Sequence, residues 1–300
     1  MVLFRAPDGT PAASMTLTSA LITYNLNGDY YAKIEAPRPM TVGQIVELPT
    51  PKGVEKFRIY TTTDTERHTA IANHLCYDLN DYVVAKSTKT DATAASCISG
   101  LNFHDFTVTT DLTGTRSFEV DAQGLFDYLK LLASQWGAFL VIEGYTITLT
   151  ATPYPNEYPL QLREGYDAIT LTKTVDTIDK CTNLWAIGDG IPTVHVYDSG
   201  QLAADGKYYT KIVQFDTDDS TTLQKLAQSY LNTHLNASTT YTARVASQKI
   251  GYTGQPLTLN FTNDHLYTRV RQTVYNAVTG RVEGYEIGDV QKSIRGILRK

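Results

Sequence analysis

The 300-residue sequence has few cysteines, no long apolar run and no excess of basic side chains. Its three cysteines, Cys76, Cys97 and Cys181, are an odd number without a CxxC pair, so we expect free, reduced thiols and no zinc or redox motif. The longest apolar runs, such as residues 138–142, fall far short of the ~20 residues that span a bilayer. Met1 is followed by no basic and apolar leader. We therefore expect no stable membrane insertion and no export by a signal peptide.

The charge balance and the motif scan exclude several further classes of function. With 26 basic and 31 acidic side chains the formal charge is −5, which argues against a general affinity for nucleic acid or anionic membrane. The sequence contains no GxSxG, HExxH, GxxxxGK[ST] or EF-hand pattern, and the glycines at 188 and 190 are too few to cradle a phosphate. We therefore predict no catalytic, cofactor-binding or metal-ligating residue, and expect that the chain is not an enzyme.

Tyrosine and threonine are abundant, with 20 Tyr against 9 Phe and 2 Trp. Both residue types suit half-buried pleated surfaces, so the predicted fold class is α+β and mainly β, with two barrel-like β modules and smaller α+β modules. Short apolar runs separated by turn residues predict the strands. These cover residues 17–24, 30–36, 44–48, 54–60, 138–142, 145–150, 168–175, 183–187, 193–197, 257–261, 267–275 and 281–287.

Three segments have helical periodicity. Residues 66–82 carry apolar side chains every four residues, and residues 121–136 form the clearest stripe, with Asp121 as the predicted N-cap and Gly137 as the C-terminal glycine. A third helix is predicted from Asp219 or Ser220 to residue 235. Residues 86–99 have almost no large apolar side chain, which indicates a connection or a weak helix.

The chain is long enough for several modules. We place them at residues 1–88, a barrel-like β module with a crossing helix; 89–158, an α+β module; 159–236, a mixed β module with a helix; and 237–300, a C-terminal β module. Residues 153–159 carry three prolines and form the best candidate linker. No tandem period of 20 to 50 residues indicates a solenoid or propeller.

The six histidines are the first candidates for a catalytic or metal site. His68 and His74 are six residues apart, which puts them on different faces of the predicted helix and favours packing or solvated histidines. The adjacent pairs His104-Asp105 and Asp264-His265 resemble parts of a triad or metal site, but neighbouring residues on a strand point to opposite faces.

The thiols and one acidic cluster are the remaining candidates. Cys76 lies two residues from His74, where helical side chains diverge by roughly 200°, so a thiol nucleophile is disfavoured there. Asp216, Asp218 and Asp219 superficially resemble calcium ligands, but the glycine and distal glutamate of such a loop are missing. Acidic residues that cap the following helix are the preferred interpretation.

An ordered set of short motifs resembles the tail-tip hub proteins of long-tailed phages, whose longer members are called prophage tail endopeptidases or tail-associated lysins. In that family a strand with Phe-Arg-Ile is followed by a helix that ends in Tyr-Asp-Leu, and this sequence has Phe57-Arg58-Ile59 and Tyr77-Asp78-Leu79 in that order. The likeness covers nearly the whole chain. Its other motifs are Tyr30-Tyr31-Ala32-Lys33-Ile34, Val42-Gly43-Gln44-Ile45-Val46, the segments 125–136, 223–235 and 284–287, and Thr182-Asn183-Leu184-Trp185-Ala186-Ile187-Gly188.

The resemblance implies a baseplate hub subunit at the virion tail tip, assembled in the host cytoplasm. Three copies would form a ring that joins the distal tail protein and closes or gates the tail channel, with DNA only as transient cargo. The tape-measure protein is a further implied partner, and a receptor-binding or fibre protein is another candidate. Since the sequence stops at Lys300, soon after the last hub module, we expect no lysin extension. An acidic balance would repel the DNA backbone in such a channel.

Two other functions stay open. One is a cell-wall-degrading tail endopeptidase that uses His104, Asp105 or a cysteine. The other is a receptor- or carbohydrate-binding tail module, because tyrosine-rich β surfaces suit contact with sugars.

Overall fold

The structure, a computed structural model, describes residues 2–26, 28–154, 158–163, 167–197, 206–235, 238–245, 251–260 and 265–288. The chain divides into two compact units. Unit 1 comprises Met1–Thr172 and Tyr241–Lys300, and unit 2 comprises Lys173–Thr240. Strands β16 (Ala168–Asp176) and β20 (Ser238–Val245) carry the chain from one unit to the other and back. The four predicted modules stay a prediction.

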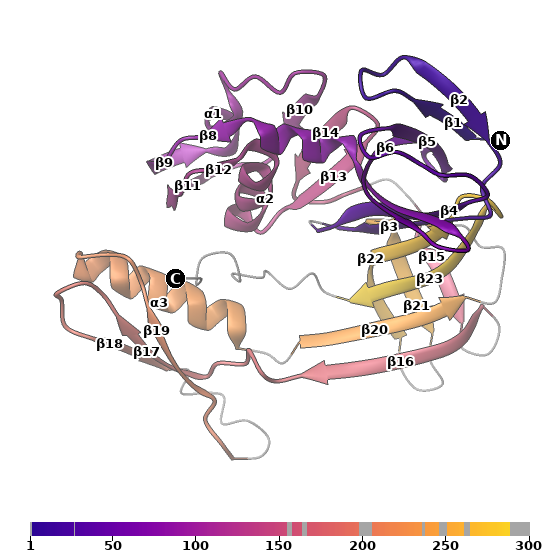
Figure 1. Cartoon of the computed structure of the whole chain (residues 1–300). Helices are drawn as coiled ribbons and strands as arrows, with labels where there is room; N and C mark the ends of the chain where they lie inside the picture. The colour runs from indigo at the N-terminus through magenta and orange to yellow at the C-terminus, as the bar shows by residue number, and fades with distance from the viewer. Residues whose placement is uncertain are drawn as a thin grey trace. The chain divides into compact units, whose positions relative to one another are not determined.

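A long open sheet dominates unit 1 (Figure 1). Its strand order is β16-β20-β23-β22-β3-β4-β7-β6-β5-β1-β2, and β21 joins β15 to β22. Among the described strands this path has two ends and no closed barrel. The strands are β1 (Val2–Arg5), β2 (Pro11–Met15), β3 (Ser19–Asn25), β4 (Tyr30–Ala36), β5 (Ile45–Thr50), β6 (Gly53–Asp64), β7 (His68–His74), β15 (Leu160–Arg163), β21 (Pro256–Asn260), β22 (His265–Asn276) and β23 (Arg281–Gly288).

Strands from the two ends of the chain pair directly in this sheet. In Figure 1 the yellow β22 runs beside the indigo β3, with Thr273 opposite Tyr24 in the antiparallel register. The side chains of β4 alternate between buried and half-exposed or exposed positions, as expected for a strand with one face on the core. Unit 1 is therefore discontinuous in sequence, and pairing between distant strands holds its two parts together.

The remainder of unit 1 is a helical and β layer between residues 75 and 150. The helix α2 packs against the 3₁₀ helix and the β13–β14 hairpin, and its buried stripe completes the same core as the large sheet. The elements are η1 (Leu75–Asp81), β8 (Val83–Val84), β9 (Ser87–Thr93), α1 (Ala94–Ile98), β10 (Thr107–Thr110), β11 (Thr115–Val120), β12 (Gln123–Gly124), α2 (Leu125–Trp136), β13 (Phe139–Glu143) and β14 (Thr146–Thr150).

Unit 2 is a three-stranded sheet covered on one face by α3 (Ser220–His234). The central strand is β17 (Asn183–Ile187), which pairs antiparallel with β18 (Val194–Tyr197) and parallel with β19 (Thr210–Gln214). Its core is separate from that of unit 1. It consists of Cys181, Leu184, Ala186, Val196, Val213, Leu223, Ala227 and Leu231.

The α+β, mainly β fold class is confirmed, as are the helices at 121–136 and 219–235 within a few residues. The helix predicted over 66–82 is wrong, because residues 68–74 form strand β7 between β4 and β6 and only 75–81 are helical. Residues 86–99 were expected to be a connection or weak helix, but 87–93 form β9 before the short α1. In the candidate linker, residues 155–157 lie outside the described residues.

Candidate functional site

Arg58 of β6 joins three segments of unit 1. Its Nε and Nη2 donate to the Asp78 carboxylate over 2.8–3.1 Å, while its Nη1 donates to the carbonyl oxygens of Pro7 and Gly43, both at 3.1 Å. The hydrogen bonds from Asp78 raise the pKa of the Arg58 guanidinium above its usual value. The Phe-Arg-Ile and Tyr-Asp-Leu motifs are thus the two halves of one bidentate ion pair, which makes them structural.

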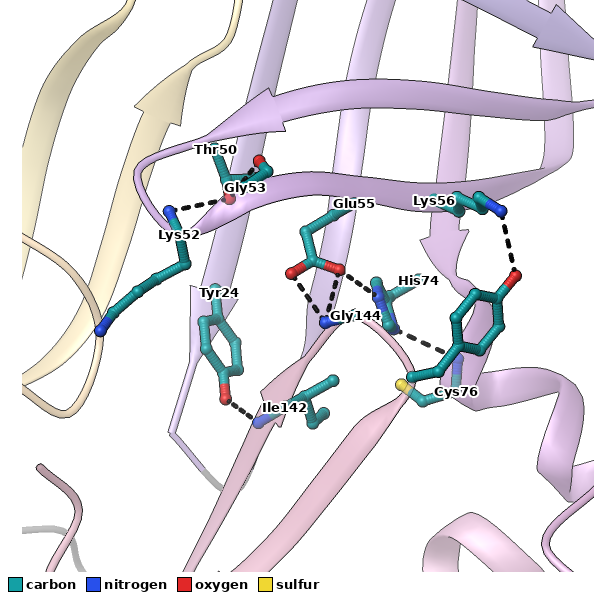
Figure 2. Close-up of polar contacts among 11 residues, drawn as sticks. Tyr24, Thr50, Lys52, Gly53, Glu55, Lys56, His74, Cys76, Ile142 and Gly144 are labelled. Atoms are coloured by element: carbon teal, nitrogen blue, oxygen red, sulfur yellow. Dashed lines mark hydrogen bonds and ion pairs between the residues drawn. The ribbon is translucent and has the colours of Figure 1, made fainter. Parts of the chain in front are cut away.

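The side chain of Glu55, near the start of β6, is a buried carboxylate (Figure 2). Glu55 is 3% exposed, and its oxygens accept the backbone N–H of Gly144 at 3.0 and 3.1 Å. Its Oε2 also lies 3.1 Å from Nε2 of His74, which is 1% exposed. Both groups are therefore satisfied within the protein, and together they fasten the turn of the β13–β14 hairpin to the large sheet.

The hydrogen bonds determine which ring nitrogen of His74 carries a proton. The backbone N–H of Cys76 donates to Nδ1 at 3.2 Å, so Nδ1 presents a lone pair and Nε2 carries the hydrogen that points at Glu55. The ring also stacks on Tyr30, with centroids 4.5 Å apart. With both nitrogens and one face engaged, His74 has the environment of a structural histidine.

An open pocket of about 430 Å³, solvent included, lies beside this network in unit 1. Five of its thirteen lining residues are tyrosines. Burial raises the pKa of Tyr24 and of Tyr30, and Tyr24 Oη accepts the N–H of Ile142 at 2.9 Å. The phenols of Tyr24 and Tyr30 are therefore neutral hydrogen-bonding groups rather than bases. The lining residues are Ile22, Tyr24, Tyr30, Thr50, Pro51, Lys52, Glu55, Ile142, Tyr154, Tyr252, Thr253, Thr273 and Tyr275.

The cysteines do not have the environment of nucleophiles. Cys76, Cys97 and Cys181 are all buried and free. Burial raises the pKa of the Cys76 and Cys181 thiols, which keeps them protonated at neutral pH.

The candidate histidines are not brought together. On strand β7, His68 and His74 share one face, contrary to the helical expectation, but six residues separate them by roughly 20 Å. His68 pairs with Asp64 at 2.8 Å. His104 stacks on Tyr82 with centroids 3.6 Å apart, and no hydrogen bond joins it to Asp105 among the described residues.

Of the other acid–imidazole pair, Asp264 lies outside the described residues and so does the side chain of His265. Of the acidic cluster at 216–219, Asp219 caps α3 by accepting the N–H of Thr222 at 2.7 Å. Within the described parts of the chain, no group of three or more His, Cys, Asp or Glu side chains could hold a metal ion.

The outward face of the unit 2 sheet carries aromatic side chains that were not among the residues predicted from the sequence. The rings of Trp185 and His195 stack there at 4.1 Å, and Tyr197 continues the stack at 5.5 Å. The three exposed rings come from two strands, and the period-two pattern of Asn183–Ile187 is the signal that could have found them. By register, the residues that share this face are Asn183, Trp185, Ile187, His195, Tyr197, Thr210, Ile212 and Gln214.

Neither a protein-family model nor a curated protein matches the sequence. Solved structures do match over nearly the whole chain. The tail protein of Neisseria meningitidis MC58 superposes with a TM-score of 0.69 at 12% identity, covering 97% of each chain. The prophage tail protein gp18 of Listeria monocytogenes EGD-e gives 0.66 at 11% identity, over 99% of this chain and 97% of that one. The fold is that of phage tail and baseplate proteins.

Two further solved structures have a similar fold. The 43 kDa tail protein of prophage MuSo2 from Shewanella oneidensis has a TM-score of 0.67 at 13% identity, with 97% of this chain and 98% of that chain covered. A chain of the phage P2 baseplate in its activated conformation gives 0.56 at 8% identity, with 98% and 100% covered. The likeness inferred from the short motifs is thus confirmed as a likeness of fold.

Within the described part of the tail-protein fold, no helix is both long enough and apolar enough to cross a membrane.

Proposed function

We propose that this chain is a structural subunit of a phage-type tail, located in the baseplate hub at the tail tip. The observation that carries the proposal is the two-way, full-length match: 97–99% of this chain superposes on 97–98% of three bacterial or prophage tail proteins. A fold alone does not determine function. Among the described residues, however, no arrangement of catalytic side chains favours an enzyme over a structural protein.

The proposed assembly is a homotrimeric ring in the virion tail, put together in the host cytoplasm. The ring would contact the distal tail protein and the tape-measure protein, with a receptor-binding or fibre protein as a further partner, and would close or gate the channel through which DNA passes. The described sheet offers open ends at β2 and β16, and β2 is mostly exposed. Such edges favour pairing with another chain.

The test is the mass of the purified chain in solution, measured by light scattering across a concentration series and followed by negative-stain imaging. A trimer of about 100 kDa, three times 33.2 kDa, with a central hole supports the hub. A monomer at every concentration, which also fails to oligomerise on the purified distal tail ring, contradicts it.

We propose that the subunit has no enzymatic activity. Two observations support this. The Cys76 and Cys181 thiols are buried and protonated, and no hydrogen bond joins His104 to Asp105 among the described residues. The experiment is digestion of purified peptidoglycan. Muropeptide release that is lost in His104→Ala would establish the endopeptidase alternative instead.

A second candidate, a carbohydrate-binding tail module, is favoured by the stacked face of Trp185, His195 and Tyr197. The eight outward residues include no Asp, Glu, Lys or Arg, which suits a neutral ligand. Glycan-array binding that is lost in Trp185→Ala and kept in Tyr208→Ala, another exposed aromatic of unit 2, would support this function. Absence of binding to any glycan would remove it.

A further inference from the structure

The side chain of Lys52 ends inside a cage of two aromatic rings and a carboxylate. Its Nζ lies 4.2 Å from the centre of the Tyr154 ring and 3.8 Å from the centre of the Tyr252 ring. It also lies 3.7 Å from Oε1 of Glu143, and the Tyr154 hydroxyl donates to that same oxygen at 2.9 Å. The two rings meet edge to face, with an interplanar angle of 78°, so they border the ammonium from two directions.

This combination of groups is selective for one ligand chemistry. Aromatic faces carry negative electrostatic potential and attract ammonium groups, including quaternary ones that cannot donate hydrogen bonds. The Glu143 carboxylate adds a full negative charge on one side. An anion would be repelled by that carboxylate, whereas an organic ammonium gains from all three groups.

The three walls and the occupant come from separate parts of unit 1. Lys52 is in the β5–β6 turn, Glu143 ends β13, Tyr154 follows β14, and Tyr252 precedes β21. Lys52, Tyr154 and Tyr252 are among the residues that line the pocket, and Glu143 contacts Lys52 and Tyr154. Figure 2 shows the Lys52 side chain extending away from the β5–β6 turn. A ligand that takes the place of the ammonium therefore has the pocket next to it.

The turn that carries Lys52 does not need its side chain. The Thr50 hydroxyl donates to the Gly53 carbonyl at 2.9 Å and accepts the N–H of Lys52 at 3.2 Å, while β5 and β6 pair up to Thr50 and Gly53. The backbone of the turn is thus held by local contacts (Figure 2). The ammonium can leave the cage without loss of the hairpin.

We propose that Tyr154, Tyr252 and Glu143 form a binding site for an organic ammonium group, which Lys52 fills as an internal latch and which an external ammonium can enter in its place. The inference stands independently of the proposed function. The external group can be a small cationic ligand or the lysine side chain of another protein, and the shared chemistry is the ammonium itself.

The test uses the full chain with Lys52→Ala, titrated with tetramethylammonium chloride by NMR or calorimetry against sodium chloride of equal ionic strength. We expect Lys52→Ala to bind the probe about tenfold more tightly than the unaltered chain, because the competitor has been removed. Lys52→Ala/Tyr252→Ala should lose the gain. The matched control is Lys33→Ala, which removes an exposed lysine of β4 and should behave as the unaltered chain.

A second probe, Nα-acetyl-lysine methylamide, separates the two sources of ammonium. Binding of both probes indicates a site for any organic ammonium, and preference for the lysine derivative indicates a partner side chain. Equal binding of tetramethylammonium by the unaltered chain and by Lys52→Ala overturns the proposal.

A measurement on the unaltered chain keeps the proposal testable if a variant does not fold. Amine acylation followed by mass spectrometry should label Lys52 several-fold more slowly than Lys33, since the caged ammonium is less available. Added tetramethylammonium should speed the labelling of Lys52 and leave Lys33 unchanged. If the probe leaves the labelling rate of Lys52 unaltered, the cage does not exchange its occupant and the proposal fails.

Discussion

At the scale of single residues, Arg58 holds together segments that are far apart in the sequence. We expect Arg58→Lys to lower the free energy of unfolding by about 1–2 kcal/mol, because an ammonium cannot reproduce the bidentate pair with Asp78 and the two carbonyl contacts. The side chains are about one third exposed, which limits the loss through solvent screening. Urea denaturation followed by far-UV circular dichroism gives the value.

The control is Arg67→Lys. Arg67 pairs with Glu35 at 3.1 Å, but its side chain is 73% exposed, so the change should be below about 0.5 kcal/mol. Equal effects of the two substitutions would mean that the Arg58 contacts add nothing beyond a surface ion pair.

Tyr285 makes the stability of the fold sensitive to alkaline pH. Burial raises its pKa from 10.0 to about 12, and its hydroxyl accepts the N–H of Gly251 at 2.6 Å. A raised folded-state pKa means that the stabilisation is complete below pH 10 and is lost as pH rises through about 12. At 1.36 kcal/mol per unit, the two-unit difference gives a loss of roughly 1–3 kcal/mol over that window.

Denaturant melts at a series of pH values between 9 and 12, compared with tyrosinate absorbance, check this expectation. Tyr285→Phe should flatten the alkaline fall in stability, whereas Tyr267→Phe, which removes an exposed ring of the neighbouring strand, should leave the slope unchanged. An identical slope in Tyr285→Phe would assign the alkaline loss to other buried tyrosines.

The residue-scale features differ in how far sequence could reveal them. Arg58 and Asp78 were both quoted as parts of motifs, yet their ion pair depends on a fold that places β6 against η1. Lys52 and Glu55 carried no signal at all. The ring contacts of Lys52 and the Gly144 contact of Glu55 join residues about 90 to 200 positions apart, and His74, 19 residues from Glu55, meets it only through the pairing of β6 with β7. The capping role of Asp219 was predicted, since both partners lie within one helical turn.

At the scale of elements, the start of α2 shows how a helix can be capped from outside its own segment. The N-cap position is Gly124 rather than the predicted Asp121, and it makes no side-chain bond of its own. Asn80 of η1 supplies the cap: its Oδ1 accepts the N–H of Asp127 at 3.0 Å, and its Nδ2 donates to the Asp127 carboxylate at 3.2 Å. A Cβ on residue 124 would clash with the Asn80 side chain and would lie only 2.8 Å from the Asn80 Cα, which accounts for the glycine.

We therefore expect Asn80→Ala to lower the free energy of unfolding by about 1 kcal/mol, the usual cost of losing an N-cap. Asp121→Ala is the matched control and should cost less than about 0.5 kcal/mol, because the Asp121 side chain is 90% exposed. Thermal and urea melts of both variants give the comparison. If Asp121→Ala lowers the free energy of unfolding more than Asn80→Ala does, Asp121 and not Asn80 caps the helix.

Strand β7 shows why periodicity misled over residues 66–82. Ile71, Leu75 and Leu79 recur every four residues, but the core-facing side chains of the strand are Ala70, Ala72 and His74. Small residues let β7 lie between β4 and β6, and the ladders on both sides outweigh the weak helical pattern. The apolar spacing continues into η1, so it spans two elements rather than one helix.

At the scale of the whole molecule, the pairing of β22 with β3 joins residues about 250 positions apart. Modules drawn as consecutive segments contain no information about such a pairing, because composition and periodicity report only on neighbours in the chain. Turn residues and the alternation of apolar and polar side chains correctly predicted the positions of most strands. The closure of unit 1 by the C-terminal strands, with unit 2 placed between β16 and β20 in the chain, is a property of the tertiary fold alone.

The separate cores imply that the two units can lose structure independently. Each unit holds one of the two tryptophans, Trp136 in unit 1 and Trp185 in unit 2, so single-tryptophan variants with the other replaced by Phe report on each unit. We expect Leu223→Ala, at a fully buried position of α3, to destabilise unit 2 by about 2–5 kcal/mol. The Trp185 transition should move to lower urea, and the Trp136 transition should stay in place.

The matched substitution in the other core is Leu129→Ala, at a fully buried position of α2. It should shift the Trp136 transition and leave that of Trp185 unchanged, since the two leucines belong to different clusters. If either substitution moves both transitions by the same amount, the chain unfolds as one cooperative unit and the second core is not an independent source of stability. Two separable transitions would instead mean that unit 2 can lose or change its structure while the long sheet of unit 1 stays folded.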